Sequence, residues 1–288
     1  MKKYTEFVRK EVRELEYPEY ADSESSSHLA GDYIFSQDKE LLAKISKHIG
    51  IDAKKIVITS GCDGGLQKIA QTFISKGDKI LIPCPTFGRY EFHTKLMGGK
   101  PVFVYFDEPF EFNLEKLKDI IEKEDVKLIF LCNPNNPTGH YISGDKIENF
   151  VKDADCIVVI DEALADYIGK SSANLIEKYP NVLIARTFSK FFQLANLRIG
   201  YIAAPDDLIP YILRTVSPFE VSSHSIEMAK KSFDIKNKVM KRAPMKLMKK
   251  TDGIQGVDGD GFRGLEGKGY VRVCKASQNK NLKTGQTN

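Results

Sequence analysis

The sequence lacks any uninterrupted apolar run close to the roughly 18 residues that a membrane-spanning helix requires. Its first residues, MKKYTEFVRKEV, include basic side chains, but no apolar segment follows them. A secretory signal peptide needs such a segment, so we expect none. These absences predict a cytoplasmic protein without a membrane partner.

Cysteine and histidine are both scarce, with five residues of each in a chain of 288. The cysteines form no C-x-x-C pair and no cluster that would complete a zinc site; they are Cys62, Cys84, Cys132, Cys156 and Cys274. The histidines also lack the spacing of metal ligands. We therefore expect buried, reduced thiols and no bound metal.

Neither sign of charge dominates the sequence. There are 43 Lys and Arg residues against 39 Asp and Glu residues, which gives a formal net charge of +4. The lysines alternate with acidic residues along the expected helices, a pattern that is typical of a solvated surface. Nucleic-acid binding is therefore not expected.

Short runs of Val, Ile and Leu, by contrast, are frequent. We expect strands at 55–60, 79–84, 101–106, 127–132, 156–161, 182–187 and 197–205. Because these runs are continuous rather than alternating, the strands should be buried on both faces. The sequence thus predicts an α/β fold with three layers, in which a mainly parallel sheet lies between helices.

Composition divides the chain into three parts. Residues 1–32 are expected to form an N-terminal helix, over about 4–16, and a polar arm. Residues 33–205 should form the large domain, and residues 206–288 a small α+β domain. Two helix starts are predicted from capping residues, one at Ser36 and one at Asn113.

Polar or aromatic residues follow several of the predicted strands. In open α/β sheets, ligands bind at the carboxyl ends of the strands, so these residues are candidates for one site. They are Cys62, Asp63, Phe87, Asn136, Asp161, Thr187, Ser189 and Lys190. Together they supply a phosphate cradle, an aromatic plate, an amide, a carboxylate and a lysine, a combination that suits pyridoxal phosphate.

Lys190 and Arg198 stand out because they lie in a mostly apolar stretch, ARTFSKFFQLANLRIGYIAAP, at 185–205. Burying a lysine is costly unless the protein uses it. We therefore expect Lys190 to be buried and to have a chemical role.

Three motifs carry a resemblance to a known family: NPNNPTG (133–139), DEALADY (161–167) and TFSKFFQLANLRIGY (187–201). They resemble the signatures of fold-type I pyridoxal-phosphate-dependent aminotransferases of class I/II, most of all the histidinol-phosphate aminotransferases. The resemblance implies a homodimer that transfers an amino group between histidinol phosphate and 2-oxoglutarate, in histidine biosynthesis. Two alternatives stay open: an enzyme like threonine-phosphate decarboxylase, and a catalytically impaired protein with the same fold.

The resemblance also implies a role for each residue around the cofactor ring. Lys190 would bind the cofactor aldehyde and then move the proton between the substrate Cα and the cofactor. Asp161 would pair with the pyridine nitrogen, Asn136 would hydrogen-bond the 3-oxygen, and Phe87 would stack on the ring.

Further residues are implied as ligands of acidic groups. The cofactor phosphate would be held by backbone N–H groups or side chains of Cys62, Asp63, Thr187, Ser189 and Arg198. Tyr33 would reach the phosphate of the partner subunit's cofactor. Arg272 would bind the substrate α-carboxylate through a bidentate pair.

The sequence also departs from the family pattern at several positions. Leu164 stands where the family usually has Tyr, and Gly64 stands where an acidic residue is common. The small domain is shorter than the pattern leads us to expect between about residues 234 and 247, so it looks incomplete. Arg263 is a candidate substitute for the arginine that would bind the substrate phosphate.

Overall fold

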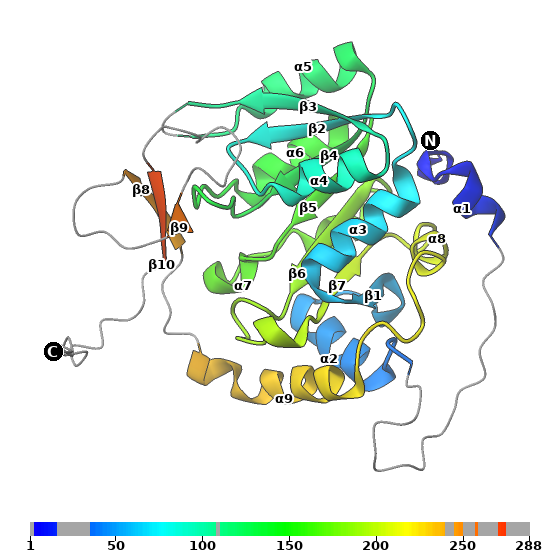
Figure 1. Ribbon diagram of the computed structural model, residues 1–288, viewed down its shortest axis with the longest axis vertical. Helices are drawn as coiled ribbons and strands as arrows, with labels where there is room; N and C mark the ends of the chain where they lie inside the picture. The colour runs from blue at the N-terminus through cyan, green and yellow to red at the C-terminus, as the bar shows by residue number, and fades with distance from the viewer. Residues whose placement is uncertain are drawn as a thin grey trace, which may run out of the picture.

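The computed structural model describes residues 3–15, 35–107, 110–239, 245–249, 257–258 and 270–274. A seven-stranded sheet with helices on both faces makes up most of this part (Figure 1). The strands are β1 (Ile56–Thr59), β2 (Lys79–Cys84), β3 (Lys100–Tyr105), β4 (Val126–Cys132), β5 (Ile157–Asp161), β6 (Val182–Thr187) and β7 (Gly200–Ala203). All seven predicted strands are therefore confirmed, most of them to within one residue at their carboxyl ends.

The strand order in this sheet is β1-β7-β6-β5-β4-β2-β3. The neighbours β3, β2, β4, β5 and β6 run parallel to one another. Strand β7 is antiparallel to both of its neighbours, β1 and β6. The sheet is thus mainly parallel, as expected, and the carboxyl ends of β4, β5 and β6 meet at one edge.

Each face of the sheet has its own apolar core. One core packs against α1 (Lys10–Glu14), α3 (Gly61–Phe73), α4 (Arg89–Leu96) and α8 (Ile209–Leu213). The other packs against α2 (Lys39–Ile49), α5 (Leu114–Glu124), α6 (Gly144–Asp153) and α9 (Ser223–Val239). Strand β4 shows the division: Ile129 and Leu131 enter one core, and Leu128 and Phe130 enter the other.

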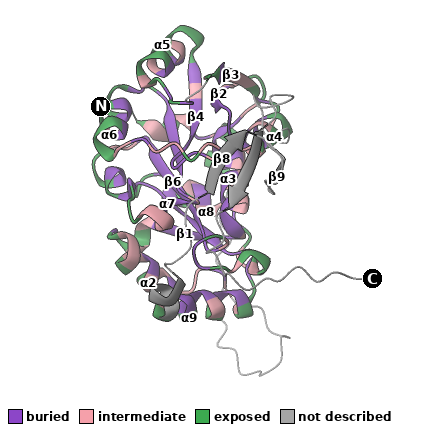
Figure 2. Ribbon diagram, turned by 90° about the vertical axis from the view of Figure 1, so that its left-hand side faces the viewer, coloured by how far each residue is buried: buried purple, intermediate pink, exposed green. Residues whose placement is uncertain are grey.

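Figure 2 shows the consequence for burial, with buried strands between helices whose exposed residues lie mostly on their outer sides. Burying apolar side chains on both faces is the main favourable contribution to folding. Continuous apolar runs are therefore what this architecture requires of its strands.

One of the two predicted helix caps differs from expectation. Helix α2 begins after Asp38, whose side chain accepts a hydrogen bond from the Leu41 N–H at 2.7 Å. The expected cap, Ser36, instead accepts from the Val221 N–H at 2.9 Å, so that prediction was wrong because a distant segment takes its hydroxyl. The predicted cap Asn113 is confirmed on α5.

The expected N-terminal helix is broken in two, into η1 (Tyr4–Phe7) and α1. Val8 is extended between them, and the Arg9 N–H donates to the Thr72 carbonyl oxygen at 2.9 Å. The break lets both Val8 and Val12 become buried against the same core.

A second, three-stranded sheet has the order β8-β10-β9, with antiparallel pairs throughout. Its strands are β8 (Met245–Lys249), β9 (Val257–Asp258) and β10 (Tyr270–Cys274). Helices α8 and α9 precede it and pack on the cores of the large sheet. The proposed boundary at 205/206 stays a prediction.

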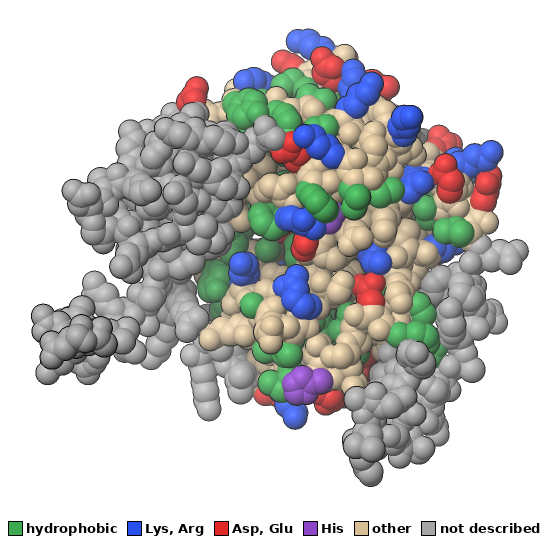
Figure 3. Space-filling model, viewed as in Figure 1, with side chains coloured by type: hydrophobic (Ala, Val, Ile, Leu, Met, Phe, Trp, Pro, Cys, Tyr) green, Lys and Arg blue, Asp and Glu red, His purple; other side chains and the backbone are tan. Residues whose placement is uncertain are grey.

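The face seen in Figure 3 carries basic and acidic side chains side by side. Among the described residues, no helix combines the length and the apolar character that crossing a membrane would require.

Candidate active site

A pocket of about 310 Å³ opens where β4, β5 and β6 end. It is lined by Cys62, Asp63, Phe87, Cys132, Asn136, Asp161, Ala163, Leu164, Thr187, Ser189, Lys190, Ala195 and Arg198. Nine of the ten residues predicted from sequence to bind a cofactor are in this set. The structure therefore brings together residues that span more than 130 positions of the chain.

Asp161 lies at the end of β5 on the floor of the pocket and is 3% exposed. Its Oδ1 accepts from the Ala163 N–H at 2.9 Å, and its Oδ2 accepts from the Tyr90 hydroxyl at 2.7 Å. Burial raises the pKa of this carboxyl, and the hydrogen bonds from Tyr90 and Ala163 oppose the rise. A buried carboxylate that faces a pocket is a partner for a cationic ring nitrogen.

Tyr90 is a functional candidate that the sequence analysis missed. Its ring is fully buried on α4, stacked on Phe130 at 5.0 Å between centroids and edge-on to Phe87 at 5.9 Å. Local sequence offers only one signal, a spacing of three residues from Phe87 that places both rings on one side of the α4 start. Its contact with Asp161 depends on the packing of α4 against α3, β2 and β3, which brings Tyr90 to the end of β5.

The loop NPNNPTG uses its three asparagines differently. Asn133 binds the backbone of Ile142 in both directions, through its amide N–H and its carbonyl oxygen, at 2.9 and 2.8 Å. Asn135 donates to the Pro85 carbonyl oxygen at 2.8 Å and accepts from the Thr86 hydroxyl at 3.1 Å. These two residues hold the loop in place, and Asn136 is the one that lines the pocket.

The start of α3 forms one end of the pocket. Its first N–H groups have no partner within the helix, as at every helix start, and Ser60 makes no side-chain cap. The Arg198 guanidinium lies so close that a Cβ at Gly61 would stand 2.9 Å from its Nη2. Gly61 also has a φ of +82°, so this position favours glycine on two grounds.

Gly200 on β7 allows this approach of α3 to the sheet. A Cβ there would lie 2.5 Å from the Arg186 carbonyl oxygen and 2.7 Å from the Cys62 nitrogen. Open N–H groups, the positive end of a helix and a guanidinium together make an anion site.

Asp63 lines the same end, but its side chain bonds to α4. Its Oδ1 accepts from Arg89 Nε at 2.8 Å and lies 2.9 Å from His93 Nε2. Although partial burial acts in the opposite direction, the hydrogen bonds from His93 and Arg89 lower the pKa of Asp63 to about 2. Its backbone, not its carboxylate, is therefore the group available to an anion.

The segment after β6 supplies the predicted hydroxyls and the lysine. Thr187 accepts from the Ser189 N–H at 3.0 Å, and Arg198 Nη1 lies 3.5 Å from Ser189 Oγ. Lys190 lines the pocket but is exposed, so the expectation of a buried lysine was wrong. The apolar character of the stretch belongs to its neighbours, such as Phe192, which is 4% exposed and packs on Phe188.

The other acidic residues of DEALADY point away from the pocket. Asp166 pairs with Arg186 and with His48, each at 2.7 Å, and Glu162 accepts from the Ser171 hydroxyl at 2.6 Å. Leu164 takes the wall position where the family pattern has Tyr. The wall therefore has no phenol at that place.

Three further residues named from the sequence cannot be placed at the pocket. Tyr33 and Arg263 lie outside the described residues. Arg272 is on β10, of which only the backbone is described. Their roles stay predictions.

The donor set fits the cofactor that the resemblance implies. An anion site, a buried carboxylate, an aromatic ring and a lysine surround one pocket of suitable size. Among the described residues, no group of His, Cys, Asp and Glu side chains could hold a metal ion. The residues that line the pocket suit an organic group with a phosphate, a basic ring nitrogen and an aldehyde.

Curated relatives are similar to this chain in sequence. Histidinol-phosphate aminotransferase of Methanosarcina mazei is 38% identical over 184 residues, which are 64% of this chain and 50% of the relative. Histidinol-phosphate aminotransferase 1 of Archaeoglobus fulgidus is 39% identical over 196 residues, 68% of this chain and 60% of the relative. The chain therefore spans about half the length of the curated relatives it matches.

Solved structures show the same fold. The histidinol-phosphate aminotransferase of Clostridium acetobutylicum superposes with a TM-score of 0.72 at 24% identity, covering 85% of this chain and 86% of that one. The L-threonine-O-3-phosphate decarboxylase of Porphyromonas gingivalis gives 0.70 at 22% identity, covering 85% and 88%.

The profile of the family described as "Aminotransferase class I and II" matches residues 4–257. The matched residues contain the whole large sheet and the pocket at the carboxyl ends of its strands. This chain therefore belongs to the class I and II aminotransferase family.

Proposed function

We propose that the chain binds pyridoxal phosphate in this pocket and transfers an amino group between histidinol phosphate and 2-oxoglutarate. One observation carries the proposal: nine of the residues named from the sequence as cofactor ligands line a single pocket. The curated relatives named above support the choice of substrate. Bound pyridoxal phosphate supplies an electron sink for the bond changes at the substrate Cα.

The residues of the chain bind and orient the reactants. The N–H groups of Cys62 and Asp63, with the side chains of Thr187, Ser189 and Arg198, would hold the phosphate. Asp161 would keep a proton on the ring nitrogen, because its buried carboxylate favours a cation beside it.

Two other side chains would orient the ring, and a third would act as the base. Asn136 would donate to the 3-oxygen, and Phe87 would lie against the ring. Lys190 would hold the aldehyde end of the cofactor and would be the base for the proton at the substrate Cα. Its position at the open side of the pocket leaves it accessible to an incoming amine.

The assembly and the location belong to the same proposal. We propose a cytoplasmic homodimer in which Tyr33 of each chain completes the phosphate site of the other. Arg272 would bind the α-carboxylate of the substrate. Sedimentation with and without pyridoxal phosphate tests the dimer, and a monomer that retains the cofactor tightly would contradict the role of Tyr33.

The first test asks which lysine binds the cofactor. The protein is mixed with pyridoxal phosphate, reduced with borohydride, digested and analysed by mass spectrometry. We expect the label on Lys190, and we expect Lys190→Ala to lose the label and at least about a thousandfold in activity. Lys123→Ala, which removes an exposed lysine from α5, should retain both.

The second test distinguishes the substrates. Histidinol phosphate and O-phosphothreonine are each supplied with 2-oxoglutarate, and glutamate and CO₂ are measured. Glutamate from histidinol phosphate supports the proposal. Release of CO₂ from phosphothreonine without glutamate would replace it with the decarboxylase, and no turnover of either compound would indicate an impaired protein.

A further inference from the structure

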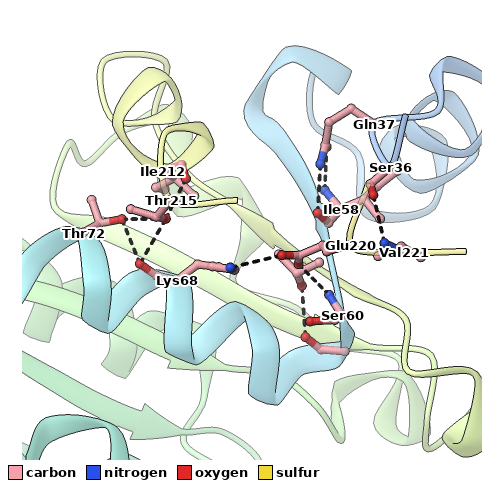
Figure 4. A network of polar contacts seen from close by, with 12 residues as sticks. Ser36, Gln37, Ile58, Ser60, Lys68, Thr72, Ile212, Thr215, Glu220 and Val221 are labelled. Atoms are coloured by element: carbon pink, nitrogen blue, oxygen red, sulfur yellow. Dashed lines mark hydrogen bonds and ion pairs between the residues drawn. The ribbon is translucent and has the colours of Figure 1, made fainter. Parts of the chain in front are cut away.

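The turn that precedes α3 is held by a residue from a remote part of the chain. Ser60 makes no side-chain cap for the helix, but its N–H donates to Glu220 Oε1 at 3.0 Å (Figure 4). The two residues are 160 positions apart. Glu220 therefore fixes the backbone directly before Gly61, where the anion site begins.

The position of Glu220 is itself fixed by a second network. The Ser36 N–H donates to the Pro218 carbonyl oxygen at 2.7 Å, and Ser36 Oγ accepts from the Val221 N–H at 2.9 Å. The next residue, Gln37, binds both backbone groups of Ile58 in β1, at 2.9 and 2.8 Å. The carboxylate is thus tied to the strand that leads into the Ser60 turn (Figure 4).

A carboxylate at this place creates an electrostatic conflict. A negative charge near the N-terminus of a helix is favourable for the empty protein. An anionic ligand at the same helix end, however, would be repelled by it, and little solvent is present to screen the repulsion. The Glu220 side chain is only 11% exposed.

Lys68 resolves this conflict. Its Nζ lies 3.1 Å from Glu220 Oε2, and its side chain is 14% exposed. Lys68 belongs to α3, and its carbonyl oxygen accepts from the hydroxyls of Thr72 and Thr215. The counter-charge is therefore part of the same helix whose start binds the anion.

We propose that Glu220 is a positioning residue for the phosphate-binding turn and that Lys68 neutralises Glu220 so that a phosphate monoester can bind beside it. This inference rests on the proposed function, which assigns a phosphate to the start of α3. Glu220 sets the geometry of the turn through its hydrogen bond to Ser60. Lys68 removes the electrostatic penalty that this geometry would otherwise impose on the phosphate.

The test measures the binding of three probes to the full chain by calorimetry: pyridoxal phosphate, pyridoxal without the phosphate, and inorganic phosphate. The variants are Lys68→Met, Glu220→Gln and the double variant. Glutamine keeps an oxygen that can accept from the Ser60 N–H, so Glu220→Gln removes the charge and retains the contact. Lys118→Met is the matched control, because Lys118 is 19% exposed and pairs with Asp153 on the far side of the fold from α3.

We expect Lys68→Met to weaken the binding of pyridoxal phosphate and inorganic phosphate by about fivefold to tenfold. Pyridoxal should bind within about twofold of the parent protein. Glu220→Gln should bind pyridoxal phosphate as tightly as the parent or more tightly, and the double variant should return close to the parent. The rescue shows that the unpaired charge of Glu220 causes the loss. The unchanged affinity for pyridoxal shows that the rest of the pocket is intact, which a general folding defect would not allow.

Three outcomes would overturn the inference: an unchanged phosphate affinity in Lys68→Met, an equal loss for pyridoxal, or a double variant as weak as Lys68→Met. If the parent protein binds inorganic phosphate with this pattern but does not bind pyridoxal phosphate, the proposed function fails and the inference stands. If it binds neither, both are wrong.

Discussion

The substitution Tyr90→Phe isolates the contact beneath the pocket. It removes one hydroxyl, which donates to Asp161 Oδ2 at 2.7 Å. The ring keeps its stacking on Phe130, so the change in packing is small. Asp161 then loses one of the donors that stabilise its ionised form.

The size of the effect follows from the charge on the acceptor. A hydrogen bond to a charged group contributes about 1.5–3 kcal/mol, which corresponds to about one to two pKa units. Burial already raises the pKa of Asp161, and Tyr90 acts against that rise. Without the hydroxyl, the pKa of Asp161 should rise further.

This shift makes the loss of stability depend on pH. A carboxyl whose folded-state pKa lies above its unfolded value stabilises the protein at low pH, and that contribution is lost as the pH rises through the folded-state pKa. Tyr90→Phe enlarges that loss. We expect the variant to be less stable than the parent by about 1.5–3 kcal/mol at pH 8 and by a smaller amount at pH 4.5.

Urea unfolding of the cofactor-free protein at the two pH values measures both numbers. The matched control is Tyr201→Phe, because the buried Tyr201 hydroxyl lies beside the Arg186 guanidinium and, within the described part of the chain, donates to no acceptor. The control should cost little at either pH. Equal losses in the two variants, or a loss for Tyr90→Phe that does not grow with pH, would refute the argument.

Two further substitutions test the anion site. Asp63→Asn should cost about 1 kcal/mol at pH 7, a value reduced for solvent screening because the side chain is one-third exposed. His93 and Arg89 lower the pKa of Asp63 to about 2, so the carboxylate stabilises the fold above its ordinary pKa and this stabilisation is lost as the pH falls from about 4 towards 2. Urea unfolding across that range would detect the loss. A cost of Asp63→Asn that stays constant from pH 7 to pH 2 would contradict this reasoning. Gly200→Ala should destabilise by about 1–3 kcal/mol and weaken phosphate binding, because its Cβ would meet backbone atoms closer than 3 Å. Gly144→Ala, where nothing lies within 4 Å of the new Cβ, should instead stabilise by about 0.4–1 kcal/mol. Thermal unfolding of both variants measures these changes, and a similar loss in both would show that crowding at Gly200 is not the cause.

The pocket was predictable as far as it depends on residues at strand ends. Asp161, Thr187 and Cys132 are the last residues of their strands, and apolar periodicity locates those ends well. The motif NPNNPTG marked the loop. It did not show that Asn133 and Asn135 hold the backbone, because both partners come from other segments.

Predictions from local sequence were wrong where a side chain points in another direction, or has another partner, than its neighbours in the chain suggest. Lys190 lies among phenylalanines in the chain, but in the structure these rings turn into the core and Lys190 turns towards the pocket. Ser36 has the residue type of a cap, but its hydroxyl bonds to Val221. Each case was decided by a side-chain direction or a partner that periodicity does not encode.

The sequence by itself determined the alternation of strands and helices, the burial of the sheet on both faces and the residues at its carboxyl edge. These features depend on apolar spacing, which acts over a few neighbouring positions. Only the tertiary structure decided that Tyr90 supports Asp161 and that Glu220 supports Ser60, 71 and 160 positions away respectively. Such contacts form because packing brings distant segments together and a buried polar group must then find a partner where it lies.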